Sequence, residues 1–482
     1  MKNSLFKKFL SFSYGSWIGL IIGFLGTMII TRILTPKDFG KASMFTLILN
    51  ILMIFTIFGT DQSFVRFFYE EKEENRGGLL YNCLKLPIVI VLIITLLIFI
   101  FNRQITMFLF EEENLIVALI LAIGIITQVL YRYGTLVIRM QQKGNLFSVL
   151  QILKRVFDLI FFLLLYFLLG KSYEIIIYST VISLIILTIM SIIFEKNYWN
   201  PKNYVKTNLK HSKTEIIKYG YPLVLTTLIT WLFQSFDKIA IKQWSNFEEL
   251  GLYTAAFKMV ALLSILQTTF STFWTPVCYE TFQKNPENKT FFQNMSKLIA
   301  FTMFFVAILS IAGKDIIIFL LGKSYRDAAN IMPFLVFMPI MYTLSETTVI
   351  GINFYKKPKW HILIASVSCL TNIIGNWILV PNYGAIGAAI STAFSYIVFF
   401  SLRTQISLKY YKVNYGLKKV YIMILIISIY AIYSIINSSF YLNLLTGFGI
   451  LIFMLILYHK ELVKAYNKFF KNNNFIFKKN EE

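Results

Sequence analysis

Several lysine and arginine side chains lie within stretches of sequence that are otherwise apolar. An ionisable group at membrane depth costs at least about 2.5–3.5 kcal/mol, so each should face protein or a watery cavity. A surplus of such cations favours an anionic ligand, and phosphate suits them because arginine offers it two parallel hydrogen bonds and lysine a compact charge. The residues predicted to bind the ligand are Arg66, Arg132, Lys154, Arg155, Lys238 and Lys258.

Few carboxylates accompany these cations. Asp158 follows Lys154 by four residues and would pair with it on one helix face. Cations near the ends of apolar stretches can instead extend to water. If an ion gradient drives the protein, the coupling group is expected among the carboxylates at membrane depth, which are Asp61, Asp158, Asp237 and Glu346.

Lys154 and Arg155 are adjacent, and adjacent residues point about 100° apart on a helix. We therefore expect them to have different roles. The four-residue spacing favours Lys154 as the structural partner of Asp158, which leaves Arg155 to face the cavity.

Motifs for enzymatic chemistry are missing from the sequence. It has no P-loop, dinucleotide-binding fingerprint or HExxH zinc motif, and its three cysteines show no metal-ligand spacing. We expect no cofactor and no metal. The predicted loops on one side of the membrane are too short for the large domain that membrane glycosyltransferases and polymerases carry, so an enzyme is the weaker interpretation.

The segments that must position these residues are apolar blocks of roughly 20 residues, each long enough to cross a hydrocarbon core of about 30 Å as a helix. The chain has 482 residues, of which 57% are hydrophobic and 15% charged. We therefore predict an all-α polytopic membrane protein. The fourteen expected spans are 10–31, 44–65, 80–101, 115–138, 146–169, 175–194, 219–241, 252–275, 298–318, 329–354, 361–380, 385–402, 420–437 and 440–458.

The connections between these spans differ in charge. Both tails and the connections on their side together hold 31 lysines and arginines, and the connections on the opposite side hold eight. Because cytoplasmic loops are enriched in such residues, we predict that both termini are cytoplasmic and that the protein lies in a bacterial inner (plasma) membrane. The net charge of +22 then requires no nucleic-acid partner.

Weak internal repetition indicates two lobes. Phe39-Gly40-Lys41-Ala42-Ser43 resembles Leu250-Gly251-Leu252-Tyr253-Thr254, which lies 211 residues later. Two copies of six spans would have the same orientation in the membrane. The predicted domains are a first lobe at 1–200, a linker at 201–218, a second lobe at 219–409, two further spans within 410–459, and a basic cytoplasmic tail at 460–482.

Two polar or small-residue patterns remain open to more than one interpretation. Gly15, Gly19 and Gly23 lie on one helix face, which favours close helix packing over bending. Asn372 and Asn376, one turn apart, would bond neighbouring helices or contact sugar hydroxyls, and we favour neighbouring helices.

Four stretches resemble motifs of the polysaccharide-repeat flippases. Thr31-Arg32-Ile33-Leu34-Thr35-Pro36-Lys37-Asp38-Phe39-Gly40 is similar to the signature R-x-L-x-P-x-x-F/Y-G, and the others are Leu250–Lys258, Leu320–Tyr325 and Val380–Ala389. The chain thus resembles the Wzx-type flippases of the multidrug/oligosaccharidyl-lipid/polysaccharide exporter superfamily. The resemblance implies two six-helix lobes and a cationic central cavity.

The predicted function is to flip undecaprenyl-pyrophosphate-linked oligosaccharide repeats to the outer leaflet by alternating access, for a surface polymer such as O-antigen or capsule. Expected partners are this lipid-linked substrate, the bilayer, and the polymerase and glycosyltransferases of the same process. The alternatives are a multidrug exporter of the same superfamily, which should have acid-rich spans, and a membrane-bound polymerase or glycosyltransferase.

Overall fold

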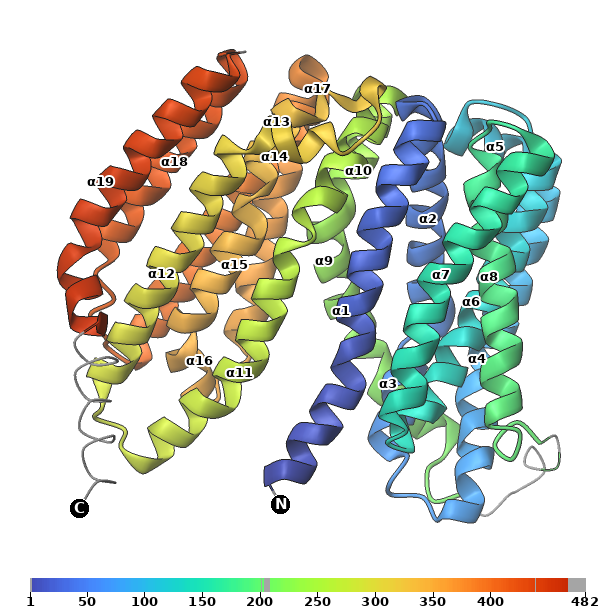
Figure 1. Ribbon diagram of the computed structural model, residues 1–482. Coiled ribbons are helices and arrows are strands. Elements are labelled where there is room, and N and C mark those ends of the chain that lie inside the picture. Colours follow the sequence, from blue (N-terminus) through green and yellow to red (C-terminus); the bar gives the residue numbers. More distant parts are fainter. Residues whose placement is uncertain (1, 201, 203–208, 438, 467–482) are drawn as a thin grey trace, which may run out of the picture. The chain divides into compact units, whose positions relative to one another are not determined.

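The computed structural model describes residues 2–200, 202, 209–437 and 439–466 (Figure 1). Every regular element in these residues is a helix. The chain divides into two compact units, Met1–Lys242 with Asn246–Thr254, and Gln243–Ser245 with Ala255–Glu482. The domain limits expected from the sequence stay a prediction, and the basic tail after Tyr466 lies outside the described residues.

In the described residues, the first unit is built from nine α-helices and one 3-10 turn, with the beginning of a tenth α-helix. They are α1 (Lys2–Ile33), α2 (Pro36–Ile57), α3 (Thr60–Phe67), η1 (Glu73–Asn75), α4 (Arg76–Ile100), α5 (Asn102–Phe110), α6 (Leu115–Met140), α7 (Gly144–Leu169), α8 (Glu174–Phe194), α9 (Lys213–Trp244) and the first turns of α10 (Phe247–Val260). Here α1 packs along α7, while α8 packs against both α6 and α7.

The second unit takes up the end of α10 and the remaining helices. They are α11 (Leu263–Lys284), α12 (Lys289–Ala312), α13 (Lys314–Phe319), η3 (Lys323–Tyr325), α14 (Ala328–Leu335), α15 (Phe337–Thr348), α16 (Ile350–Phe354), α17 (Lys359–Tyr410), α18 (Leu417–Ile436) and α19 (Phe440–Tyr466). Within this unit α15 packs against α17, and α12 against α19.

Helix starts follow from local sequence. Thr35 caps α2: its hydroxyl accepts the Asp38 N–H at 3.2 Å, and Pro36 occupies the first turn, where a missing N–H costs nothing. At α6 the Asn114 side chain accepts the Val117 N–H at 3.1 Å. The flippase-like stretch at 31–40 is therefore a helix end followed by a capped helix start.

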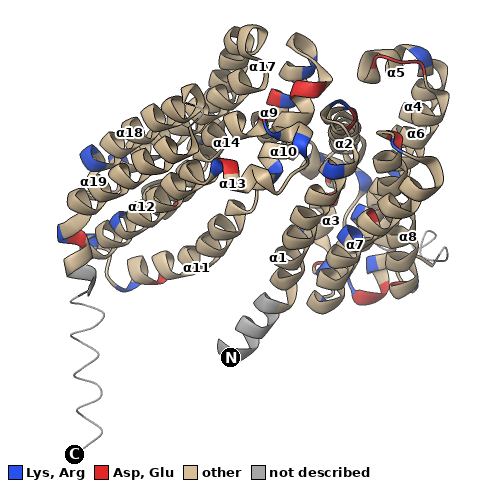
Figure 2. Cartoon of the chain, turned by 45° about the horizontal axis from the view of Figure 1, so that its top comes forward, with Lys and Arg blue, Asp and Glu red and all other residues tan. Residues whose placement is uncertain are grey.

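Eleven of the described helices are long and apolar enough to cross a membrane, or twelve if α10 and α11, bent by 44°, form one span. In Figure 2 most of the helical ribbon is tan, with charged residues gathered toward loops and helix ends. The eleven do not include α7, which carries Lys154, Arg155 and Asp158. The helical multi-span class is confirmed, while the count of fourteen stays a prediction.

Four expected spans differ from single straight helices, and the one expected at 298–318 is divided between α12 and α13. The one expected at 44–65 is interrupted, because α2 ends at Ile57 and Gly59 adopts a positive φ of 75° before α3 begins. The one expected at 252–275 is the bent pair of α10 and α11. The one expected at 329–354 is divided into α14, α15 and α16.

The 52-residue helix α17 folds back on itself. Gly384 has φ 52° and ψ −132°, a combination open almost only to glycine. Across this break the Ser391 hydroxyl donates to the Asn372 carbonyl at 2.8 Å, although 19 residues of straight helix would separate them by roughly 28 Å. Asn376 Nδ2 also contacts Ser391, at 3.3 Å. The two asparagines therefore bond between the halves of a hairpin, the interpretation favoured from the sequence.

Candidate functional site

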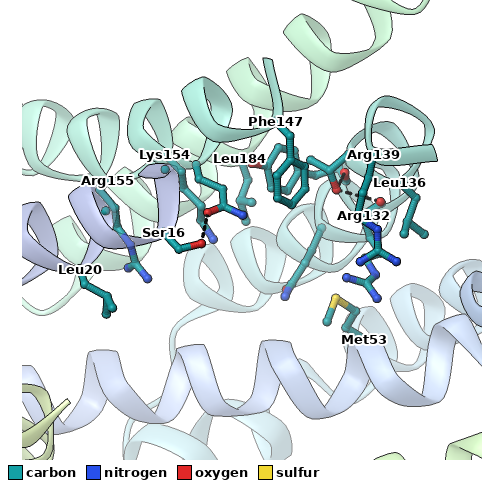
Figure 3. A pocket seen from close by; sticks show the side chains of 16 residues that line it. Ser16, Leu20, Met53, Arg132, Leu136, Arg139, Phe147, Lys154, Arg155 and Leu184 are labelled. Carbon is teal, nitrogen blue, oxygen red and sulfur yellow. Dashed lines mark hydrogen bonds between the residues drawn. The ribbon is translucent and has the colours of Figure 1, made fainter. Parts of the chain in front are cut away.

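A cavity of about 500 Å³ lies within the first unit (Figure 3). This volume is in the range typical of small-molecule sites. Its walls come from α1, α2, α6, α7 and α8. The lining residues are Gly15, Ser16, Gly19, Leu20, Met53, Gln128, Tyr131, Arg132, Thr135, Leu136, Arg139, Phe147, Gln151, Lys154, Arg155 and Leu184.

Four cations border this cavity. Arg132 and Arg139 project from α6, and Lys154 and Arg155 from α7. Among the described residues that line it, none is an aspartate or glutamate. An anion would therefore meet several positive charges and no direct repulsion from the wall.

Arg132 is held by a carboxylate behind the cavity wall. Its Nη2 and Nε lie 2.7 and 3.2 Å from Asp61 Oδ2. Asp61 is buried in the first turn of α3, and its Oδ1 accepts the Gln62 N–H at 2.9 Å. The ion pair fixes the guanidinium and offsets its charge, and Asp61 itself is not among the residues that line the cavity.

The glycine face of α1 makes room for Arg155. A Cβ on Gly15 would come within 2.4 Å of Ser148 Cα, so α1 and α7 approach closely there. One turn on, a Cβ on Gly19 would lie 3.6 Å from Arg155 Cγ, and one on Gly23 4.0 Å from its Cδ. The Arg155 side chain therefore runs along this glycine face, which supports the close-packing interpretation.

Polar side chains complete the cavity. The Ser16 hydroxyl donates to Gln151 Oε1 at 2.8 Å, as Figure 3 shows near Lys154, which leaves the Gln151 amide N–H groups as donors. Gln128 Nε2 donates to Asn50 Oδ1 at 3.0 Å, and Gln128 Oε1 has no hydrogen-bond partner in the described chain. The Gln128 oxygen is buried, so the donors beside the charges are the amide N–H groups of Gln151.

Of the cations predicted from the sequence, the structure brings Arg132, Lys154 and Arg155 to one cavity. Both residues of the adjacent pair line it, so the assignment of separate roles to Lys154 and Arg155 stays a prediction. The cavity is wide enough for two long side chains that leave the helix about 100° apart. Asp158 lies one turn beyond Lys154 on the same helix.

The other predicted residues lie outside the cavity lining. Arg66 is exposed and pairs with Glu70. Lys238 is partly buried in α9, and Lys258 is exposed on the part of α10 that belongs to the second unit. Asp237 is buried and accepts the Tyr253 hydroxyl at 2.7 Å.

Glu346, the remaining predicted carboxylate, takes part in a buried ion pair of the second unit. Arg403 Nη1 lies 2.9 Å from Glu346 Oε1 and donates to Ser345 Oγ at 2.6 Å. This arginine was missed because it sits just beyond an expected span.

Arg139 is the cavity cation that sequence reasoning missed. It lies in the last turn of α6 and was counted as a loop residue. Its spacing of seven from Arg132 is two helical turns, which places both side chains on one face. This seven-residue spacing is the sequence feature that could have identified Arg139 as a cavity residue.

A second charged cluster joins the end of α3 to the start of α9, and its Glu70 lies in the turn between α3 and η1. The ring of buried His211 stacks on Phe67 with centroids 4.1 Å apart. Its Nε2 and Nδ1 lie 3.1 Å from Glu70 Oε2 and from Glu215 Oε1. Burial raises the pKa of Glu70, but hydrogen-bonded Arg66 and the nearby His211 and Lys210 outweigh burial and leave that pKa below its ordinary value.

The family model for polysaccharide biosynthesis proteins matches residues 5–282, more than half of the chain. The chain belongs to that family. An uncharacterized membrane protein of Methanocaldococcus jannaschii is 21% identical over 409 residues, 80% of each chain. The capsular polysaccharide biosynthesis protein CapF of Staphylococcus aureus is 21% identical over 210 residues, 42% of this chain and 51% of CapF.

Solved transporters share the fold. The lipid II flippase MurJ in an inward closed conformation has a TM-score of 0.68 at 16% identity, covering 94% of this chain and 99% of MurJ. An inward-facing multidrug resistance MATE transporter of the MOP superfamily has a TM-score of 0.58 at 14% identity, covering 82% and 96%. The resemblance drawn from the motifs is confirmed: this is a polytopic protein of the polysaccharide biosynthesis family with the fold of flippases and exporters.

Proposed function

We propose that the protein flips undecaprenyl-pyrophosphate-linked oligosaccharide repeats from the cytoplasmic to the outer leaflet of a bacterial inner membrane by alternating access. The observation that carries this proposal is the cavity with four cations and no lining carboxylate. The family, whose description names polysaccharide biosynthesis, supports it. So does the fold shared with a lipid II flippase.

The charges of the cavity suit a diphosphate. Arg132, Arg139, Lys154 and Arg155 supply four positive charges, and Asp61 and Asp158 behind or beside the wall offset two of them. The remaining two match a pyrophosphate diester, which carries two negative charges. Arginine forks and the lysine ammonium would hold its oxygens through charge-assisted hydrogen bonds.

The uncharged part of the substrate has its own partners. Gln128, Tyr131, Thr135 and Gln151 line the same cavity, and amide and hydroxyl groups of this kind suit sugar hydroxyls. The lipid chain would stay in the bilayer. Lys238 and Lys258 lie outside the cavity and remain proposed contacts for the substrate as it leaves toward the outer leaflet. Both termini are proposed to be cytoplasmic.

The multidrug alternative meets an obstacle in this cavity. Exporters of cationic compounds need carboxylates facing the ligand, whereas a cationic drug here would meet four like charges.

If an ion gradient drives transport, the proposed coupling group is one of the intramembrane carboxylates. Asp158, closest to the cavity cations along α7, is the proposed leading candidate.

The test is flipping in proteoliposomes loaded with a fluorescent undecaprenyl-pyrophosphate oligosaccharide. Wild-type protein should expose the sugar on the opposite leaflet, and Arg139→Ala should slow this at least about tenfold through loss of a charge-assisted contact. Arg103→Ala is the matched control, because that side chain is 76% exposed and pairs with Glu113 away from the cavity. Equal flipping in protein-free vesicles would refute the proposal.

A further inference from the structure

A buried tyrosine connects three helices of the first unit beside the cavity. Tyr133 of α6 is fully buried, and its hydroxyl lies 2.7 Å from Thr60 Oγ1 of α3 and 3.2 Å from the Cys83 carbonyl oxygen of α4. All three residues belong to the first unit. A carbonyl can only accept, so when the single hydrogen of the Tyr133 hydroxyl is donated to Cys83, the hydroxyl accepts from Thr60.

The Cys83 carbonyl needs this donor because of Pro87. Pro87 lies inside α4 and has no backbone N–H, so the carbonyl four residues earlier loses its donor within the helix. A backbone oxygen without a donor is costly where water cannot reach it. The Tyr133 hydroxyl therefore replaces the donor that α4 lacks.

The two hydroxyls have fewer hydrogens than contacts. Thr60 Oγ1 also lies 2.7 Å from the carbonyl oxygen of Ile57, the last residue of α2. With the Tyr133 hydrogen directed to Cys83, Thr60 must share its one hydrogen between Ile57 and Tyr133. Removing the Tyr133 hydroxyl would therefore change the bonding of Thr60 as well as that of Cys83.

The start of α3 depends on contacts of this kind. The helix has eight residues and follows Phe58 and Gly59, both of positive φ, and its N-cap Gly59 has no side chain to cap it. A helix this short is not stable by itself, so packing determines its direction. The Phe64 ring packs edge-on against the Tyr133 ring, with centroids 6.3 Å apart. Tyr133 thus contacts α3 through both its ring and its hydroxyl.

A second contact joins the same two helices one residue away. Asp61 follows Thr60 and Arg132 precedes Tyr133, and Asp61 Oδ2 lies 2.7 Å from Arg132 Nη2. Arg132 lines the cavity (Figure 3), whereas Thr60 and Tyr133 are not among the lining residues. A contact that fixes Thr60 also restrains the neighbouring Asp61, and through it the guanidinium that a ligand would meet.

We propose that Tyr133 is a positioning residue that sets the orientation of Arg132 in the cavity through Thr60 and Asp61. The proposal rests on the proposed binding of a pyrophosphate in this cavity. An arginine already held in its binding orientation loses less conformational freedom when the ligand binds. Without the Tyr133 hydroxyl, Asp61 still offsets the charge of Arg132, but the guanidinium can take up a wider range of positions.

Tyr133→Phe tests the proposal because it removes the hydroxyl and keeps the ring. The affinity of purified protein in nanodiscs for undecaprenyl pyrophosphate should fall about two- to tenfold, the range expected for one uncharged hydrogen bond. In the Arg132→Ala background the same substitution should have no further effect, since Tyr133 acts through that arginine. Equal losses of affinity in the two backgrounds would overturn the proposal.

The matched control is Tyr430→Phe. Tyr430 is a buried tyrosine of the second unit whose hydroxyl donates to the Asn443 carbonyl at 2.9 Å. Its replacement removes a buried hydroxyl of the same kind and should leave the affinity for undecaprenyl pyrophosphate unchanged. A loss equal to that of Tyr133→Phe would show that the effect is a general one of lost buried hydroxyls, against the proposal.

Pro87→Ala separates positioning from folding. Its new N–H can donate to the Cys83 carbonyl, so Pro87→Ala/Tyr133→Phe should regain the thermal stability lost in Tyr133→Phe. Its affinity should stay below that of Pro87→Ala alone, because the contact with Thr60 is still missing. An affinity that recovers together with the stability would show that the Tyr133 hydroxyl only supports the fold, and would refute the positioning role.

A further measurement needs no lipid. Phenylglyoxal modifies accessible guanidinium groups, and mass spectrometry can compare Arg132 with Arg139, which borders the same cavity. Tyr133→Phe should raise the rate of modification at Arg132 about twofold or more relative to Arg139. An unchanged ratio would refute the positioning role, whereas a raised ratio would support it even if the wild-type protein bound no undecaprenyl pyrophosphate and the proposed function failed.

Discussion

Arg155→Ala is expected to weaken substrate binding strongly while leaving the folded protein nearly as stable as before. The side chain is exposed to the cavity, and in the described chain it makes no ion pair with a carboxylate. A charge-assisted hydrogen bond contributes about 1.5–3 kcal/mol. Since about 1.4 kcal/mol corresponds to tenfold, affinity for the pyrophosphate should fall roughly 10- to 150-fold.

Binding of undecaprenyl pyrophosphate to purified protein in nanodiscs measures this loss, and flipping in proteoliposomes should fall in parallel. Arg155→Lys should recover part of the affinity if charge dominates and little if a two-pronged contact is required. Membrane abundance is measured alongside, with Arg103→Ala as the exposed-arginine control. Wild-type affinity and flipping in Arg155→Ala would show that this arginine does not bind substrate, and the reasoning from cavity position would fail.

Three further substitutions probe other parts of the structure. Asp61→Asn should release the arginine it holds at 2.7 Å and lower unfolding stability by about 1–2 kcal/mol in a detergent melt, whereas an unchanged melt would argue against a structural ion pair. Because the folded pKa of Glu70 is depressed beside Arg66, its stabilising contribution should be present at neutral pH and be lost as pH falls through that pKa. Hydrogen exchange at the start of α9 should show this loss, and Glu70→Gln should abolish the pH dependence. Gly384→Ala should cost about 1–3 kcal/mol and reduce abundance, unlike Gly449→Ala, where a Cβ meets nothing within 4 Å.

Hydropathy and charge predicted the class of the fold because both are properties of the sequence itself. Apolar blocks of roughly 20 residues specify membrane helices wherever they pack. Helix breaks inside such blocks depend on the backbone conformation of single residues, such as the positive φ of Gly59. Hydropathy averaged along the sequence does not reveal them. The reversal at Gly384 falls in the gap between the expected spans 361–380 and 385–402.

The cavity was predictable only in part for a related reason. Depth along a span selected Arg132, Lys154 and Arg155, which all line the cavity, but depth does not give the rotation of a helix about its axis. Arg66 illustrates the limit, since it lies on the short helix α3, where its guanidinium meets Glu70 one turn away. The pairing of Arg132 with Asp61, 71 residues apart, required the packed structure.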